Sequence, residues 1–218
     1  IWDLRAIAKR RTPKGPFDYT DGAAESEVTL ERARRAYLDL EFRPNILIDV
    51  KNVSLDCQVL GQTFAMPMGM APTGFTRMMH SEGENAVARA AQKFGIPYTL
   101  STLGTTTIED VVSAAPDGTN WFQLYMWKDR DASMQLVERA KKAGVKNLLL
   151  TVDVPVAGAR YRDTRNGLTV PPSLSAKTLI DAIPRPEWWM NFLTTPAISF
   201  VSMQSWNGTV AELLDFMF

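Results

Sequence analysis

The sequence predicts an α/β protein with a parallel sheet, and two observations carry this prediction. Apolar runs recur roughly every 25–30 residues with a helical pattern between each pair, which is the size of a βαβ unit. The runs are also nearly continuous in apolar residues, as in LLLTVD at 148–153, and this suits strands that are buried on both faces of a sheet. The rhythm alone leaves two architectures open, a doubly wound sheet and a closed (β/α)8 barrel.

Residues 1–60 precede this rhythm and are predicted to form an entry segment. A first helix is expected over Trp2–Arg11, ended by Pro13 and Gly15. A second helix is expected from about Glu25 to Leu40, before Arg43-Pro44, because apolar residues recur there at helical spacing. Short strands are expected at 46–50 and 53–60.

Residues 61–166 are predicted to hold the first four βα units, with strands at 66–71, 98–101, 121–126 and 146–153. Ser81 with Glu84, and Thr106 with Glu109, form the capping-box pattern that begins a helix. A further helix is expected over 131–143, and glycines follow two of the helices, at Gly95 and Gly144.

Residues 167–218 break the rhythm and are predicted to form a long mobile loop after the fourth strand. The stretch holds five prolines and the segment WWMNFLTTPAISFVSM at 188–203. That segment is shorter than the ~18–20 apolar residues of a membrane span. It suits an interfacial membrane anchor, and it equally suits packing on the barrel or on another subunit.

The composition excludes several classes of site. With 24 Lys+Arg and 24 Asp+Glu the formal net charge is 0, which gives no electrostatic footprint for nucleic acid. The single cysteine, Cys57, excludes an internal disulfide and a multi-cysteine metal site, and it favours a reducing, cytoplasmic compartment. The single histidine, His80, excludes a site that needs two imidazoles from these residues.

Polar side chains follow the predicted strands at their carboxyl ends, where parallel α/β folds bind ligands. Residues i and i+2 of a strand face the same side, so Gln123 lies with Tyr125, and Thr151 lies with Asp153. An amide, a phenol, a hydroxyl and a carboxylate therefore converge, and such groups suit a flat heterocycle with alternating C=O and N–H groups. The alternative is that they only cap strands or fill a barrel layer.

Several motifs, in order and spacing, resemble the FMN-dependent α-hydroxy acid dehydrogenase/oxidase family up to about residue 172. They are FDYTDGA at 17–23, FRP at 42–44, MP at 66–67 with APTG at 71–74, LST at 100–102, WFQLY at 121–125 and LTVDVP at 150–155. The segment GARYRD at 158–163 looks most like the membrane-associated lactate and mandelate dehydrogenases of that family.

The resemblance implies a (β/α)8 barrel that carries one FMN, of which residues 1–218 supply the N-terminal part. It implies cofactor contacts from Pro72, Thr73 and Gly74 near the reactive N5 edge, and from Ser101, Gln123 and Thr151 to the isoalloxazine. It implies substrate contacts from Tyr19, Tyr125 and Arg160. Of the catalytic set, Tyr125 and Arg160 would hold the substrate and its developing charge, and Asp153 would orient a histidine base.

The implied reaction is oxidation of an (S)-2-hydroxy acid, lactate-like or mandelate-like, to the 2-oxo acid. Electrons would pass to a quinone-type acceptor, and Gly74 favours this dehydrogenase reading because the oxidases usually have alanine there. By analogy the protein would be a homotetramer, peripheral on the inner membrane. The alternatives are a soluble oxidase that makes H2O2 and a non-catalytic half-barrel.

The family's base histidine belongs to a later Gly-Gly-Arg-rich motif that residues 1–218 do not contain. His80 precedes a predicted helix and is not expected to be the base. The sequence is therefore read as the N-terminal part of a longer enzyme, and this part alone is predicted not to turn over substrate.

Overall fold

The entry segment consists of three helices and a long extended stretch. The computed structural model describes residues 1–153, 158–168, 180–199 and 201. Helix α1 spans Trp2–Arg11 as predicted, and α3 spans Val28–Leu38, within the predicted range. Between them α2 spans Lys14–Asp21, which was not predicted. Its prolines stand before the helix and in its first turn, where no intrahelical N–H bond is lost.

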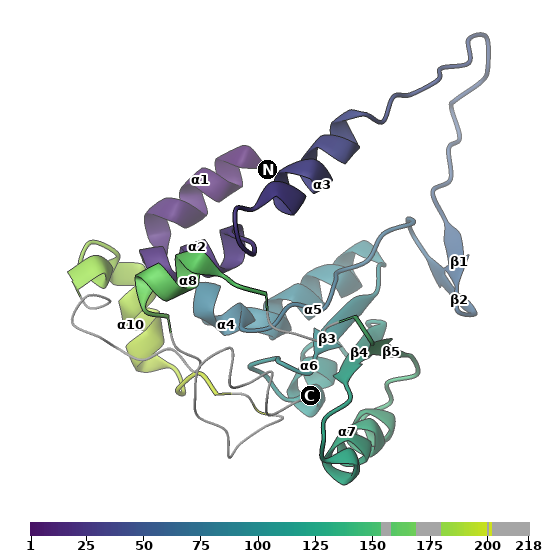
Figure 1. The fold of residues 1–218 in the computed structure, drawn as a ribbon. Coiled ribbons are helices and arrows are strands. Elements are labelled where there is room, and N and C mark those ends of the chain that lie inside the picture. The colour runs from purple at the N-terminus through teal and green to yellow at the C-terminus, as the bar shows by residue number, and fades with distance from the viewer. Residues whose placement is uncertain (154–157, 169–179, 200, 202–218) are drawn as a thin grey trace.

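The predicted strand at 46–50 is wrong, because that segment runs without a hydrogen-bonded neighbour among the described residues. Figure 1 shows the chain leaving α3, running outward and returning to a small hairpin. The hairpin pairs β1 (Cys57–Val59) antiparallel with β2 (Gln62–Phe64), so the predicted strand at 53–60 survives only in its last part. Leu60 and Gly61 both have positive φ, at 52° and 76°, which suits a tight two-residue hairpin turn.

A parallel sheet of three strands forms the centre of the structure, in the order β3-β4-β5. Strand β3 spans Tyr98–Ser101, β4 spans Asn120–Tyr125 and β5 spans Leu148–Thr151, each within a residue or two of the prediction. The expected strand at 66–71 is reduced to one parallel bridge between Met70 and Tyr98. Pro67 contributes to this, because proline cannot donate to a ladder.

The helices between these strands are α4 (Thr76–Met79), α5 (Gly83–Phe94), α6 (Ile108–Ala114) and α7 (Arg130–Lys142). They pack on the sheet through a core that includes Phe122 and Leu124, which are almost completely buried. Helix α6 is capped by Thr107, whose side chain accepts from Asp110 N, one residue later than predicted.

The capping box predicted for Ser81 and Glu84 does not form. Glu82 is the N-cap of α5, no side chain caps it, and Glu84 bonds instead to the loop after β3. The Glu84 carboxylate therefore accepts a tertiary hydrogen bond from Thr105 and does not cap the start of α5, although the local sequence pattern predicted that it would.

In the described part of the chain beyond the sheet there are two helices. Helix α8 spans Tyr161–Asn166, and α10 spans Pro186–Thr194, so the expectation of a loop is wrong at 186–194. The parts of that prediction at 169–179, 200 and 202–218 lie outside the described residues. Figure 1 shows α1, α2, α8 and α10 gathered on one side of the molecule.

An ion-pair network joins α2 to α8. Arg162 of α8 pairs with Asp21 at 3.2 Å and also with Glu27. Asn166 donates to Asp18 Oδ2 at 2.8 Å. The network holds together two segments about 140 residues apart, and Tyr19 and Arg160 lie on these segments.

Candidate functional site

A row of polar side chains crosses the three parallel strands at their carboxyl ends. Ser101 of β3 donates from Oγ to Gln123 Oε1 at 3.1 Å, and Gln123 Nε2 of β4 donates to Thr151 Oγ1 of β5 at 2.8 Å. Ser101 and Gln123 are directly paired residues in the sheet register. The structure thus brings together the three side chains that were predicted to hydrogen-bond a flavin ring.

The direction of the Gln123 amide is fixed by the main chain. The backbone N–H of Thr102 donates to Gln123 Oε1 at 3.2 Å, and a backbone N–H can only donate. The oxygen of the amide must therefore face Thr102, and the nitrogen must face Thr151. Thr102 itself, which the sequence reasoning missed, is fully buried and donates from Oγ1 to Gln123 O at 2.6 Å.

The row presents hydrogen-bond donors. Gln123 Nε2 carries two hydrogens and gives one to Thr151, so the second is left for a ligand. Thr151 Oγ1 accepts that bond, and within the described part of the chain its own hydrogen has no acceptor. Two donors side by side fit the carbonyl oxygens and ring nitrogens at the edge of an isoalloxazine.

The segment Pro72-Thr73-Gly74 lies against the loop after β3. Phe75 follows it with φ +58°, a left-handed conformation that is uncommon in a bulky residue and is found at functional sites. Its backbone N–H donates to Leu103 O at 3.1 Å. A Cβ placed on Gly74 would lie 3.0 Å from Leu103 Cβ, so the two segments touch because residue 74 is glycine.

Arg160 and Tyr19, both predicted to bind substrate, lie in contact. The Arg160 guanidinium lies 4.8 Å from the centre of the Tyr19 ring and also donates to the Tyr19 carbonyl. Its Nε donates to Asp163 Oδ2 at 2.5 Å. Asp163 is buried and was missed by the sequence reasoning, although its place three residues after Arg160 at the start of a helix is a usable signal.

The phenols of Tyr19 and Tyr125 lie in the same electrostatic environment. Burial raises the pKa of Tyr19 to about 12, although the positive charge of Arg160 lowers it in part. Burial also raises the pKa of Tyr125, and the charge of Asp153 adds to the effect. Both hydroxyls, protonated at neutral pH like ordinary phenols, therefore keep their protons to higher pH. Asp153 is exposed just beyond β5, and the predicted histidine partner is not among residues 1–218.

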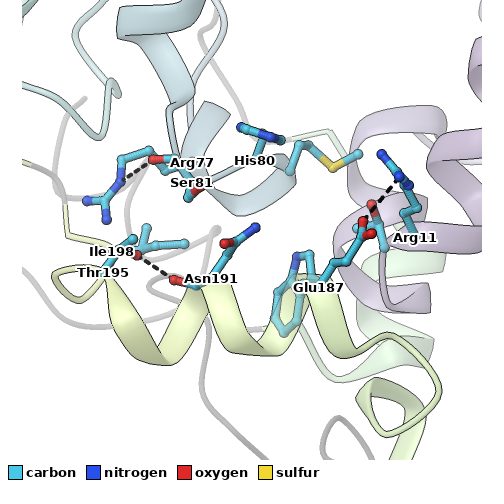
Figure 2. Close-up of a pocket in the computed structure, with 11 residues that line it drawn as sticks. Arg11, Arg77, His80, Ser81, Glu187, Asn191, Thr195 and Ile198 are labelled. Atoms are coloured by element: carbon cyan, nitrogen blue, oxygen red, sulfur yellow. Dashed lines mark hydrogen bonds and ion pairs between the residues drawn. The ribbon is translucent and has the colours of Figure 1, made fainter.

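His80 lies apart from these residues, as expected. It lines a pocket of about 90 Å³ between α1, α4 and α10, where Arg11 pairs with Glu187 at 3.2 Å. Figure 2 shows His80 at this pocket with Arg77, Ser81 and residues of α10. None of the predicted flavin or substrate residues lines it.

Among residues 1–153, 158–168, 180–199 and 201, no group of histidine, cysteine or acidic side chains could hold a metal ion. In the same ranges no helix has the length and apolar character to cross a bilayer.

Comparison with known proteins identifies relatives along the whole chain. Residues 8–215 match the pattern of the family described as FMN-dependent dehydrogenase. A provisionally named L-lactate dehydrogenase of Mycobacterium tuberculosis is 56% identical over 100% of this chain and 53% of its own. L-lactate dehydrogenase of Pectobacterium atrosepticum is 40% identical over 99% of this chain and 55% of its own.

Solved structures give the same result. The monotopic membrane protein (S)-mandelate dehydrogenase superposes with a TM-score of 0.87 at 37% identity, covering 93% of this chain and 54% of that one. Mandelate oxidase superposes with a TM-score of 0.73 at 38% identity, covering 81% of this chain and 50% of that one. The chain spans about half the length of these relatives, and the strands that it contributes belong to a (β/α)8 barrel.

Proposed function

The chain belongs to the FMN-dependent dehydrogenase family, and from that premise we propose that it forms the flavin and substrate site of an enzyme that oxidises an (S)-2-hydroxy acid to the 2-oxo acid. The single observation that carries the proposal is the row Ser101–Gln123–Thr151, with its amide held in one direction and two donors left for a ligand. FMN, when bound, supplies the two-electron acceptor. The segment Pro72-Thr73-Gly74 is proposed to lie at its reactive edge.

Arg160 and the two phenols are proposed to hold the substrate. A guanidinium forms strong, charge-assisted hydrogen bonds with a carboxylate, and Asp163 and the Tyr19 carbonyl keep Arg160 beside the Tyr19 ring. Tyr19 and Tyr125 are neutral donors at neutral pH, as ordinary phenols are, and can bind the carboxylate or hydroxyl of the substrate; burial raises their pKa values and extends this state to higher pH. Arg160 then also stabilises the negative charge that develops as the hydroxyl proton leaves.

The proton acceptor is proposed to be a histidine from outside residues 1–218. Asp153 would orient this imidazole and stabilise its cationic form, as a carboxylate does beside other imidazole bases. The negative charge of Asp153 contributes to the raised pKa of Tyr125, which supports a shared position at the mouth of the site. We therefore expect residues 1–218 alone, even with FMN, to give no turnover above a flavin blank.

The electron acceptor is proposed to be a membrane quinone. Glycine at position 74 supports this reading, and so does α10, which exposes Met190 (52%), Leu193 (67%) and part of Trp189. Such an apolar helix face suits attachment in the plane of a bilayer surface. The name of one structural relative, monotopic membrane protein (S)-mandelate dehydrogenase, favours attachment to a membrane surface, and we propose the cytoplasmic side of the inner membrane.

A second candidate acceptor is O2, with H2O2 as product. It is favoured by the likeness to mandelate oxidase, which covers 81% of this chain. A homotetramer is proposed by analogy with the family, and light scattering of the purified protein tests it.

The test uses the protein expressed from its complete reading frame and purified with FMN. Anaerobic addition of (S)-lactate or (S)-mandelate should bleach the flavin absorbance, while the (R)-acids should not. Reoxidation by a soluble quinone should outpace reoxidation by air. Bleaching by neither acid in a flavin-loaded sample would contradict the proposed function, and equal rates with air and quinone would replace the dehydrogenase by the oxidase.

A further inference from the structure

Glu84 is a buried carboxylate that the proposed mechanism does not use. Its side chain is fully buried in the first turn of α5, and among the described residues no cation pairs with it. Oε1 accepts from the Thr105 backbone N–H at 2.7 Å and from Thr105 Oγ1 at 2.8 Å. Oε2 accepts from Thr106 Oγ1 at 2.8 Å. A buried charge is costly unless it is well hydrogen-bonded, so these bonds are an essential feature of the fold.

The loop that Glu84 holds, residues 102–107, touches both halves of the proposed flavin site. On one side the backbone N–H and Oγ1 of Thr102 bond to Gln123, and the Leu103 N–H donates to Ser101 Oγ at 3.1 Å. On the other side Leu103 O accepts from Phe75 N, directly after Gly74. The loop therefore connects the polar row of the sheet to the segment at the reactive edge.

The same carboxylate also reaches α4. Thr105 Oγ1 donates to Glu84 and accepts from the Arg77 backbone N–H at 3.3 Å. Gly104 allows this packing, since a Cβ there would lie 2.9 Å from Leu100 Cδ1 and 3.0 Å from Ser101 O. Helix α4 is thus joined to the loop through Thr105, and α5 is joined to it through Glu84.

We propose that Glu84 is a positioning residue for the flavin site: its buried carboxylate sets the place of loop 102–107, and through Thr102 and Leu103 it sets the relative place of Gln123 and Gly74. The inference rests on the proposed function for its consequence in catalysis, but the hold of Glu84 on the loop is a property of the chain itself. Misplacement of reacting groups by ~1 Å can cost as much as ~10²-fold in rate, so a loop of this kind matters.

The experiment compares Glu84→Ala and Glu84→Gln in the complete protein, with Glu82→Gln as the matched control. Glu82 is an exposed glutamate two residues earlier that pairs with Arg89. We expect Glu84→Ala to raise the Kd for FMN about tenfold, to shift the absorbance bands of bound flavin and to lower kcat more than it changes KM. Glu84→Gln should restore most of these values, because its Oε1 still accepts from Thr105 while its N–H group donates to the Thr106 hydroxyl. Glu82→Gln should match the wild type.

Hydrogen exchange supplies a readout that needs no flavin. The Thr105 amide should exchange about tenfold faster or more in Glu84→Ala than in wild type, because its acceptor is gone. If Glu84→Ala does not fold, Thr106→Val removes one of the donors and should move FMN affinity and exchange in the same direction by a few-fold.

The outcomes distinguish failure of the positioning role of Glu84 from failure of the proposed function. Unchanged FMN affinity, flavin spectrum and Thr105 exchange in Glu84→Ala, or in Thr106→Val where that variant is the test, would overturn the positioning role. A Glu84→Gln variant as impaired as Glu84→Ala would also overturn it, by pointing to the charge rather than the placement of the loop. Failure of the wild type to bind FMN would overturn the proposed function and leave the exchange test of Glu84 standing.

Discussion

Gly74 and Leu103 approach each other so closely that a Cβ atom on Gly74 would lie 3.0 Å from the Cβ of Leu103 and 3.3 Å from its carbonyl oxygen. The contact joins the segment proposed to lie at the flavin edge to the loop after β3. Any change at either residue is therefore transmitted to the other.

Gly74→Ala is expected to destabilise the protein through this contact. Overpacking of a tight contact typically costs about 1–3 kcal/mol, and the gain in chain stiffness from removing a glycine offsets about 0.4–1 kcal/mol of it. Urea denaturation of Gly74→Ala, Leu103→Gly and the double variant measures the coupling. We expect Leu103→Gly to relieve part of the cost of alanine at position 74, because it removes the Cβ that the new methyl group would meet, and strictly additive effects would mean that the two residues do not compete for space.

Gln123→Glu tests the donor role of the amide. The carboxylate can still accept from Thr102 N and Ser101 Oγ, so the fold should persist, but the N–H group offered to a ligand is lost and a negative charge replaces it. We expect FMN to bind about tenfold more weakly or worse, which corresponds to about 1.4 kcal/mol. Fluorescence titration with FMN measures this, and Gln135→Glu on the exposed side of α7 is the control. Equal affinity in the two variants would contradict the donor role.

Tyr19 should give the protein a characteristic response to alkali. Its pKa rises from 10.0 to about 12 on folding, because burial disfavours the phenolate. Between these values the unfolded chain has lost the proton and the native chain has kept it, so the stability from this group falls as the pH rises from about 10 to 12. Absorbance at tyrosinate wavelengths should show a late step that Tyr19→Phe removes. Tyr37→Phe, at an exposed position on α3, should leave that step in place.

Arg162 should stabilise the docking of α8 on α2. Hydrogen bonds from Arg5, and then the contacts with Arg162, lower the pKa of Asp21 below 3.8. A carboxyl group whose pKa is lowered on folding stabilises the native state at pH values above its unfolded-state pKa. This stabilisation is lost as the pH falls through the folded-state pKa. Arg162→Met should lower the free energy of unfolding at pH 7 by roughly 1–3 kcal/mol, between the values for exposed and buried pairs. Denaturation at pH 7 and pH 3 checks this: the variant should lose less on acidification than the wild type, and Arg35→Met on α3 should behave like the wild type.

Leu193 should contribute to membrane attachment. It is 67% exposed on α10, and an aspartate there would place a charge in the apolar face. We expect Leu193→Asp to reduce cosedimentation with vesicles of phosphatidylglycerol and phosphatidylethanolamine several-fold. Leu38→Asp, at an 82% exposed leucine of α3, is the matched control. Equal loss in both variants, or none in either, would argue against α10 as the attachment site.

The sequence pattern predicted those parts of the fold in which local and tertiary preferences agree. Strands β3 and β4 are rich in aromatic, β-branched and aliphatic residues that favour strands, and α7 begins after Asp129 and ends before Gly144, so both kinds of element were predicted within a residue or two. The helix α2 was missed because Pro13, Gly15 and Pro16 look like a loop, although prolines are compatible with a first turn. The segment 46–50 has the composition of a strand but has no partner among the described residues.

In the candidate site, too, the residues placed by local pattern could be predicted and those placed by tertiary contacts could not. Ser101, Gln123 and Thr151 could be predicted because each stands in the carboxyl-terminal half of a parallel strand; the register pairs Ser101 with Gln123, and Thr151 with Tyr125 two residues beyond Gln123. The roles of Thr102 and Glu84 could not, because their partners lie about 20 residues away and the local pattern around Glu84 indicated a helix cap instead. Asp163 was missed because its buried position depends on the docking of α8 against α2.

The main-chain N–H of Thr102 has a consequence for cofactor redesign. No substitution at position 102 other than proline removes that donor. The backbone therefore sets the orientation of the Gln123 side-chain amide, whatever side chain stands at position 102. An engineer who wished this edge to accept a ring that presents N–H groups in place of carbonyls would gain little from exchanging Ser101 or Thr151. A change at position 123 itself, such as glutamate, would be needed to present an acceptor there.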